Sequence, residues 1–284
     1  DVGIIYADRE YQDSFNRAGG FDYRARLKNR WTLTGQAITS ATQNISNSTS
    51  GEQECEIQTL TCSGQAYYQQ LSYIDLHHSS WISYNDTSAG YVTDTGFFRR
   101  PDIREGGGYY NYIFRPKGGH VLSHGPSVYS ERIVDHTGLP LDFYTSAAYS
   151  MTFRFRTTIA ASIGLSQDRL RPIDYSALPH NVEYHSHTSA VSFYSSPLPY
   201  IAVGGGVYTG NTINYSPPAS SGPVPVNVTS PNLNVEVKPI GSIDMNNSYV
   251  YTHFTKPSNN DLVYDNHELI SRWNYQLTKD FSFN

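Results

Sequence analysis

The sequence predicts an all-β protein, an antiparallel transmembrane β-barrel of the outer-membrane type with roughly a dozen or more strands. Three observations support this prediction: hydrophobic and polar residues alternate over long runs, aromatic residues are abundant, and charged residues are scarce. Aromatic residues make up 14% of the 284 residues and charged residues 16%. This composition suits strands with one side in lipid and the other in a wet interior.

The charge balance argues against a nucleic-acid partner. Twenty Lys and Arg face 25 Asp and Glu, which gives a net charge of −5, whereas nucleic-acid binders carry a basic excess. Hydrophobic residues are only 38%, but 24 Tyr, 12 Phe and 3 Trp argue against a disordered chain. No run of about 18 apolar residues is present, so no transmembrane helix is expected. Residues 1–6 already resemble a strand, so we expect a mature or trimmed product.

Period-two alternation marks the individual strands. The runs exceed the five to six residues, roughly, that are typical of a soluble β-sandwich strand. A soluble sandwich also alternates, with its apolar side inward, and it remains the alternative. The clearest alternating runs are residues 30–40, 149–156, 159–165, 201–207 and 233–237, and the longest candidate strands are 139–156 and 182–196.

The connections between these runs differ in length. Tight turns are predicted at Lys28-Asn29 and at Lys117-Gly118-Gly119. Long polar connections are predicted at residues 42–62, 169–180 and 215–231, the last rich in proline, which blocks strand pairing. Short turns at one end and long loops at the other are typical of outer-membrane barrels.

Two cysteines, Cys55 and Cys62, lie in the first long connection. Their spacing matches no common metal motif. We therefore expect a small loop disulfide formed in an oxidising compartment. A metal-binding or redox-active pair is the alternative.

Three segments resemble a known family. They are Gly3–Glu10 with Phe15–Asp22, Thr95–Arg104, and Arg272–Thr278. In this order they resemble bacterial proteins that join an N-terminal carbohydrate-binding-like domain to a C-terminal β-barrel of unknown function. The resemblance implies one outer-membrane barrel domain over residues 1–284, without the carbohydrate-binding-like domain. It leaves open whether the barrel is complete at its two ends. It implies no established activity.

Two clusters of charged residues are the candidate sites. We expect them at the lumen or rim of the barrel, because a charge at mid-depth in lipid costs about 2–4 kcal/mol. Either cluster could select solutes or could be a structural network of salt bridges. The clusters are Arg99, Arg100, Asp102, Arg104 and Glu105, and Asp8, Arg9, Glu10 and Arg17.

No metal, cofactor or catalytic site is predicted. His185 and His187 share a strand face, but a zinc site needs three or four convergent ligands. The sequence holds no nucleophile elbow, zinc-protease motif or phosphate loop. His136 stands isolated in the sequence and is expected in the lumen or at an interface.

These observations predict a non-enzymatic protein of the bacterial outer membrane, a pore or a membrane anchor linked to carbohydrate handling. Its expected partners are the lipid bilayer, saccharides or other small solutes, and further protein chains or a second copy. One alternative is a secreted carbohydrate-binding or adhesive protein, in which Trp31, Trp81 and Trp273 would supply stacking surfaces. A hydrolase is the third hypothesis.

Overall fold

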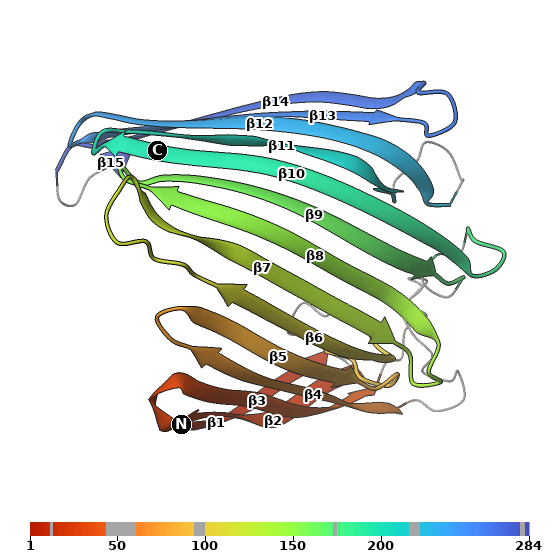
Figure 1. Ribbon diagram of the computed structural model, residues 1–284. Helices are drawn as coiled ribbons and strands as arrows, with labels where there is room; N and C mark the ends of the chain where they lie inside the picture. Colours follow the sequence, from red (N-terminus) through yellow and green to blue (C-terminus); the bar gives the residue numbers. More distant parts are fainter. Residues whose placement is uncertain are drawn as a thin grey trace. The chain divides into compact units, whose positions relative to one another are not determined.

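One antiparallel sheet contains all the strands in the described residues, and its strand order is the order of the sequence (Figure 1). The computed structural model describes residues 1–11, 14–43, 61–93, 100–172, 175, 177–215, 222–278 and 282–283. No helix in these residues is long and apolar enough to cross a membrane. The strands are β1 (Val2–Tyr11), β2 (Ser14–Leu27), β3 (Trp31–Gln43), β4 (Thr61–Ile74), β5 (His78–Thr87), β6 (Ile103–Tyr112), β7 (Val121–Val134), β8 (Pro140–Phe153), β9 (Thr157–Leu170), β10 (Val182–Leu198), β11 (Ile201–Asn214), β12 (Val224–Ile240), β13 (Ile243–Thr255), β14 (Leu262–Gln276) and β15 (Ser282–Phe283), with a 3-10 turn η1 (Lys28–Arg30).

The fold class that the sequence predicts is confirmed. Fourteen of the fifteen strands are long, from the ten residues of β1 to the seventeen of β10. The predicted runs overlap β3, β8, β9, β10, β11 and β12. A sequential antiparallel sheet of long strands is the wall of an outer-membrane barrel, and soluble sandwiches have shorter strands.

One predicted run is too long. Alternation from Tyr149 suggested a strand that reaches Arg156, but β8 ends at Phe153. Phe155 and Arg156 have positive φ angles of 62° and 51°, in the left-handed region. They form the tight turn to β9. Periodicity failed here because these turn residues continue the apolar and basic pattern of the strand.

The predicted proline-rich connection at 215–231 is also too long. Strand β12 begins at Val224 and includes Pro225 and Pro231. Its paired residues with β13 begin at Asn227 and skip Ser230 and Pro231. Proline has no N–H for the ladder, so these prolines fit where β12 makes no pair with β13.

The chain divides into two compact units, each of which is described by itself. Unit 1 comprises residues 1–111, 129–145 and 167–183, and unit 2 comprises residues 112–128, 146–166 and 184–284. Strands β6 to β10 contribute to both. The prediction of one domain over 1–284 stays a prediction.

Neighbouring strands run in opposite directions, so successive connections lie at opposite ends of the sheet. In unit 1, residues 28–30 and 75–77 form short connections at one end, whereas the strand bounds leave long connections from β3 to β4, from β5 to β6 and from β9 to β10. In unit 2, residues 154–156, 199–200 and 241–242 are short, whereas 215–223 and 256–261 are longer. We call these the short-turn end and the long-connection end of each unit.

The two faces of the sheet in unit 1 differ in chemistry. The strand registers assign alternate residues to opposite faces. One, which we call the aromatic face, is mostly apolar over its middle, and the other, the polar face, carries charged and amide groups. The aromatic face includes Ile4, Phe21, Leu33, Leu71 and Ile82, and the polar face includes Asp22, Arg24, Thr34, Gln70 and Ser83.

Unit 2 has the same division. A row of paired residues across five strands carries Phe193, Gly205, Leu233, Tyr249 and Leu269. The opposite face of β12 to β14 carries polar groups, among which Asn234 pairs with Ser248 and Asn246 with Arg272. We use the same two names for these faces.

A small core lies at the long-connection end of unit 1. Ile103, Ile133 and Leu141 are almost fully buried, and Leu139 packs against them. These residues flank the β7–β8 turn, so the core fixes the place where the charged residues of the candidate site meet.

Candidate functional site

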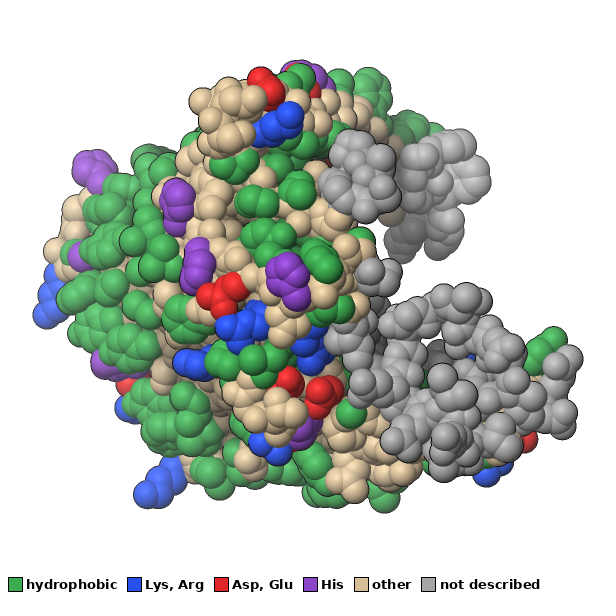
Figure 2. All heavy atoms as spheres, turned by 90° about the vertical axis from the view of Figure 1, so that its right-hand side faces the viewer, with side chains coloured by type: hydrophobic (Ala, Val, Ile, Leu, Met, Phe, Trp, Pro, Cys, Tyr) green, Lys and Arg blue, Asp and Glu red, His purple; other side chains and the backbone are tan. Residues whose placement is uncertain are grey.

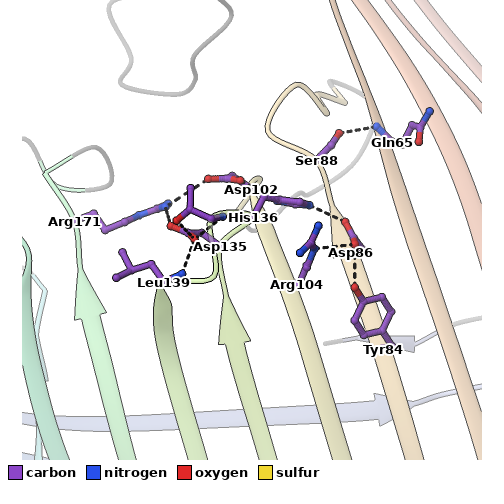
Figure 3. A network of polar contacts seen from close by, with 11 residues as sticks. Gln65, Tyr84, Asp86, Ser88, Asp102, Arg104, Asp135, His136, Leu139 and Arg171 are labelled. Atoms are coloured by element: carbon purple, nitrogen blue, oxygen red, sulfur yellow. Dashed lines mark hydrogen bonds and ion pairs between the residues drawn. The ribbon is translucent and has the colours of Figure 1, made fainter.

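A network of charged side chains joins the strand ends of unit 1 at the long-connection end (Figure 3). It contains Asp86 from the end of β5, Asp102 and Arg104 around the start of β6, Asp135 and His136 from the β7–β8 turn, and Arg171 directly after β9. We call these six residues the charged network.

His136 stands at the centre of the charged network. Its Nδ1 lies 2.8 Å from Oδ1 of Asp102, and its Nε2 lies 2.9 Å from Oδ1 of Asp86. Both ring nitrogens therefore lie within hydrogen-bond distance of a carboxylate oxygen. One histidine therefore links three segments of the chain.

Asp86 has two further partners. The hydroxyl of Tyr84 donates to its Oδ2 over 3.0 Å, and Nε of Arg104 lies 3.4 Å from the same oxygen. Tyr84, Asp86 and Arg104 lie on the aromatic face, so these carboxylate charges are paired where the apolar band ends.

Asp135 organises the β7–β8 turn. Its Oδ1 accepts hydrogen bonds from the backbone N–H groups of Thr137 at 2.9 Å and Leu139 at 2.8 Å, and from the Thr137 hydroxyl at 2.6 Å. Its Oδ2 lies 3.8 Å from Arg171. Burial alone would raise the pKa of Asp135, but these bonds and Arg171 outweigh it and hold the pKa below its usual value.

Ion pairs flank the network on the following strands. Arg100 lies 3.1 Å from Asp142, and Arg169 pairs with Glu183 and donates to the carbonyl of Pro140. Figure 2 shows acidic, basic and histidine side chains gathered side by side, with broad hydrophobic areas beside them. The paired charges bind the ends of β5 to β10 together.

The structure brings together part of the first predicted cluster. Asp102 and Arg104 belong to the charged network, and Arg100 flanks it. Glu105 follows Arg104 in β6 and therefore lies on the opposite, polar face, near Tyr68. Arg99 lies outside the described residues.

Sequence reasoning missed the residues that come from other strands. His136 stood alone in the sequence, and Asp86, Asp135, Asp142 and Arg171 were not selected. In the structure, each of these residues lies within two positions of a strand end. The pairing of those ends required the register, which the sequence does not supply.

The second predicted cluster divides between the two faces of the sheet. Asp8, Glu10 and Arg17 lie on the aromatic face close to the long-connection end. Arg17 pairs with Glu10 and lies 3.4 Å from Asp8, while its guanidinium stacks over Phe15. Arg9 lies on the polar face. The role of this cluster at a lumen or rim stays a prediction.

Tyrosines line the aromatic face just inside its long-connection end. Their hydroxyls donate to polar side chains two residues closer to that end: Tyr6 to Asp8 over 2.9 Å, Tyr67 to Gln65 over 2.5 Å, and Tyr84 to Asp86 over 3.0 Å. Three rings on three strands therefore turn their apolar bodies to the middle of the face and their hydroxyls outward.

A second aromatic row lies at the short-turn end of the same face. Trp31 packs on Tyr73 with ring centroids 4.8 Å apart, and the Tyr73 hydroxyl donates to Asp75 over 2.7 Å. His78 bonds the Tyr110 hydroxyl over 2.9 Å. Hydrogen bonds from Tyr73 and from the backbone N–H groups of His78 and His77 lower the pKa of Asp75 to about 2.

The distance between the hydroxyl partners of the two aromatic rows can be estimated along β4. The two hydroxyl partners, Gln65 and Asp75, are ten positions apart in the sequence. Ten residues of strand span about 34 Å, which a tilt of about 40° reduces to about 26 Å. The apolar band of outer-membrane barrels is about 25 Å tall and is bounded by aromatic girdles.

One polar contact lies between the rows. The Tyr23 ring lies over Gly35, where an added Cβ would come within 2.6 Å of the ring. The amide of Gln69 donates to the Tyr23 hydroxyl over 2.8 Å. The three residues pair across β2, β3 and β4, so the tyrosine covers the glycine and satisfies the amide.

The remaining predicted sites are placed as follows. Cys62 is buried in β4, but Cys55 lies outside the described residues, so the disulfide stays a prediction. Among the described His, Cys, Asp and Glu residues, no group of three is positioned to hold a metal ion.

Comparison with known proteins gives structural likenesses only. No family model and no functionally characterised protein matches the chain. The resemblance to the bacterial barrel family therefore stays a prediction.

Three solved structures are similar to the chain at low sequence identity. The ferric yersiniabactin uptake receptor FyuA of Yersinia pestis has a TM-score of 0.46 and 11% identity over 95% of this chain and 50% of the receptor. The ferric preacinetobactin receptor BauA of Acinetobacter baumannii has a TM-score of 0.49 and 12% identity over 98% of this chain and 55% of the receptor. OccAB3 of A. baumannii has a TM-score of 0.42 and 10% identity over 99% of this chain and 98% of OccAB3. The chain spans about half the length of the two receptors.

Proposed function

We propose that this chain is a wall of a β-barrel in a bacterial outer membrane and that it serves as a passage for small polar solutes, without catalysis of its own. The main support is the aromatic face of unit 1. Two rows of aromatic residues bound an apolar band whose estimated height is close to that of a membrane core. The bilayer is the partner of this face.

The exposure of the apolar band supports a lipid partner. In the band of unit 1, Ile4 and Ile82 are 88% and 64% exposed, and in unit 2 Leu269 and Trp273 are 72% and 61% exposed. Apolar surface in water costs about 25 cal/mol per Å². Soluble monomers rarely leave such a contiguous patch open, whereas lipid removes the cost.

The polar face supports a wet interior rather than a filled anchor. In unit 1 it presents charges of both signs, among them Asp22, Arg24 and Arg26. Charged side chains on this face need water or partners. A solute path would provide that water. The charged network would stabilise the strand ends at the long-connection end of unit 1.

Gel mobility tests the membrane proposal. The protein is produced with an outer-membrane export signal, and the membrane fraction is extracted in detergent and run with and without boiling. We expect the protein in the membrane fraction, with faster migration before boiling because a folded barrel resists the detergent. Planar-bilayer conductance then separates a passage from an anchor.

Two results would overturn parts of this proposal. Recovery in the soluble fraction without a heat-dependent shift would reject the membrane role and favour a secreted carbohydrate-binding protein. A heat-dependent shift without conductance would retain the barrel and reject the passage in favour of an anchor.

A further inference from the structure

A cavity of about 180 Å³ opens in unit 2 at the short-turn end of β10 to β12. Its lining includes Arg156 from the β8–β9 turn, Tyr194 and Ser196 from β10, Tyr200 from the β10–β11 turn, and Glu236 and Lys238 from β12. We call it the tyrosine cavity. The charged network and the aromatic rows of unit 1 contribute none of these residues.

A glycine lies opposite one of the two tyrosines of the cavity. Tyr194 of β10 is opposite Gly204 of β11, and a Cβ on Gly204 would come within 3.3 Å of the Tyr194 ring. The ring therefore lies along the wall beside the glycine. Tyr194 and Tyr200 are 49% and 51% exposed, so both rings present surface to a ligand.

The positive and negative side chains in and directly beside the cavity nearly balance one another. Lys238 Nζ lies 2.7 Å from Glu236 Oε1 and 3.2 Å from Asp244 Oδ2. The lining thus holds two cations, Arg156 and Lys238, and one carboxylate, Glu236. Asp244 lies outside the lining and supplies a second carboxylate through its contact with Lys238. The cavity thus offers fixed hydrogen-bond donors and acceptors, with little net attraction for an ion.

Neutral polar groups continue the cavity along the polar face. Asn234 is opposite Gly204, and its amide donates to Asn246 of β13 over 3.0 Å. Ser196 adds a hydroxyl that both donates and accepts. A ligand that extends from the cavity would meet amides and hydroxyls rather than an apolar wall.

We propose that the tyrosine cavity binds a neutral saccharide of one or two rings. A sugar ring has an apolar C–H face that packs on an aromatic ring, and its hydroxyls both donate and accept hydrogen bonds. Two exposed tyrosines beside a balanced set of charges match both properties. A singly charged solute would lie beside at least one side chain of the same charge, which would repel it.

This inference does not depend on membrane insertion, since the cavity lies in one unit and on the polar face. If the proposed passage is correct, the cavity is a solute subsite near its short-turn end. If the protein is secreted, the cavity is its ligand site. Failure of the gel-mobility experiment would therefore reject the membrane proposal alone, and failure of the binding experiment would reject the saccharide site alone.

Calorimetric titration with maltose and with cellobiose tests the proposal. Gluconate serves as the anionic comparison, and a detergent without a sugar headgroup prevents competition. We expect at least one disaccharide to bind and gluconate to bind more weakly. Tyr200→Ala removes one stacking surface and should weaken binding about fivefold to tenfold, whereas Tyr200→Phe should retain most of it.

Tyr275→Ala is the matched control, because Tyr275 lies on the aromatic face at the short-turn end of β14. This variant should bind as the unmodified protein does, and all variants should show the same thermal unfolding. Absence of binding by both disaccharides, an unchanged affinity in Tyr200→Ala, or tighter binding of gluconate would each overturn the proposal.

Discussion

At the scale of single residues, His136 shows how much one side chain can connect. It bonds carboxylates on β5 and at the start of β6 from a turn between β7 and β8. Its neighbours Asp86 and Asp102 are only 23% and 31% exposed. Both carboxylates therefore depend on the imidazole for part of their hydrogen bonding.

Replacement of His136 by alanine should destabilise the protein. His136→Ala leaves two partly buried carboxylates without a shared donor, so we expect a loss of about 1–3 kcal/mol in the free energy of unfolding. The temperature at which the folded gel band disappears measures this loss. His180→Ala, at an exposed position of the β9–β10 connection, is the control and should leave that temperature unchanged.

Asp135 predicts acid sensitivity at the β7–β8 turn. Its pKa in the folded protein lies below the usual value. The ionised form therefore adds stability that is fully present above about pH 3.9 and is lost as the pH falls through the folded pKa. We expect the stability difference between the unmodified protein and Asp135→Asn to be large at pH 7 and to shrink towards pH 2.

Unfolding temperatures at pH 7, 5 and 2 provide the measurement. Asp261→Asn, whose carboxylate pairs with Lys256 on the surface, is the control and should show a small difference at every pH. A difference for Asp135→Asn that does not depend on pH would contradict the role of its ionised carboxylate.

The sequence identified only part of the candidate site at this scale. Arg100, Asp102 and Arg104 could be selected because they crowd together in the chain. Asp86, His136 and Arg171 could not, since they meet those residues only after four strands have taken their register. A charge cluster in the sequence shows only that charged residues are close together along the chain. A network at strand ends depends on which strand ends are neighbours in the sheet.

At the scale of elements, the contact of Tyr23 with Gly35 predicts a defined cost for added volume. Gly35→Ala would place a Cβ within 2.6 Å of the Tyr23 ring, so the ring must move and its bond with Gln69 weakens. We expect a loss of about 1–3 kcal/mol in the free energy of unfolding. Gly106→Ala, where the Cβ meets no atom within 4 Å, is the control.

Heat-dependent gel mobility distinguishes the two glycine variants. The folded band of Gly35→Ala should disappear at a lower temperature than that of Gly106→Ala. Equal temperatures would mean that Tyr23 can leave Gly35 without penalty.

The strands were predicted well where alternation was regular and poorly where single residues departed from their usual roles. Strands β9 and β11 follow their hydrophobic pattern closely. Pro231 concealed part of β12 because proline normally excludes a strand, yet here it occupies a gap in the ladder to β13. Local propensity cannot show such a gap, because the gap belongs to the pair of strands.

At the scale of the whole molecule, the two faces of the sheet give a direct test of which side meets lipid. Ile82 and Ser83 are adjacent in β5 and lie on opposite faces. In a barrel, Ile82→Arg places a charge in the apolar band and should cost about 2–4 kcal/mol, whereas Ser83→Arg faces the wet side.

Assembly into the membrane fraction measures this difference. Ile82→Arg should reduce the amount of heat-shifted protein strongly, and Ser83→Arg should reduce it little. In a soluble protein the result would differ, because Ile82 is 64% exposed and an arginine there would be harmless. Equal behaviour of the two variants would therefore reject the membrane-facing assignment.

The strand order also bears on how such a protein changes in size over evolutionary time. The order in the sheet is the order in the chain, so each described strand pairs with the strand that follows it in the sequence. Duplication or deletion of one hairpin would insert or remove two neighbouring strands and leave every other connection unaltered. A gene segment that encodes one hairpin could therefore be gained or lost as a unit. The number of strands in the wall would then change by two at a time.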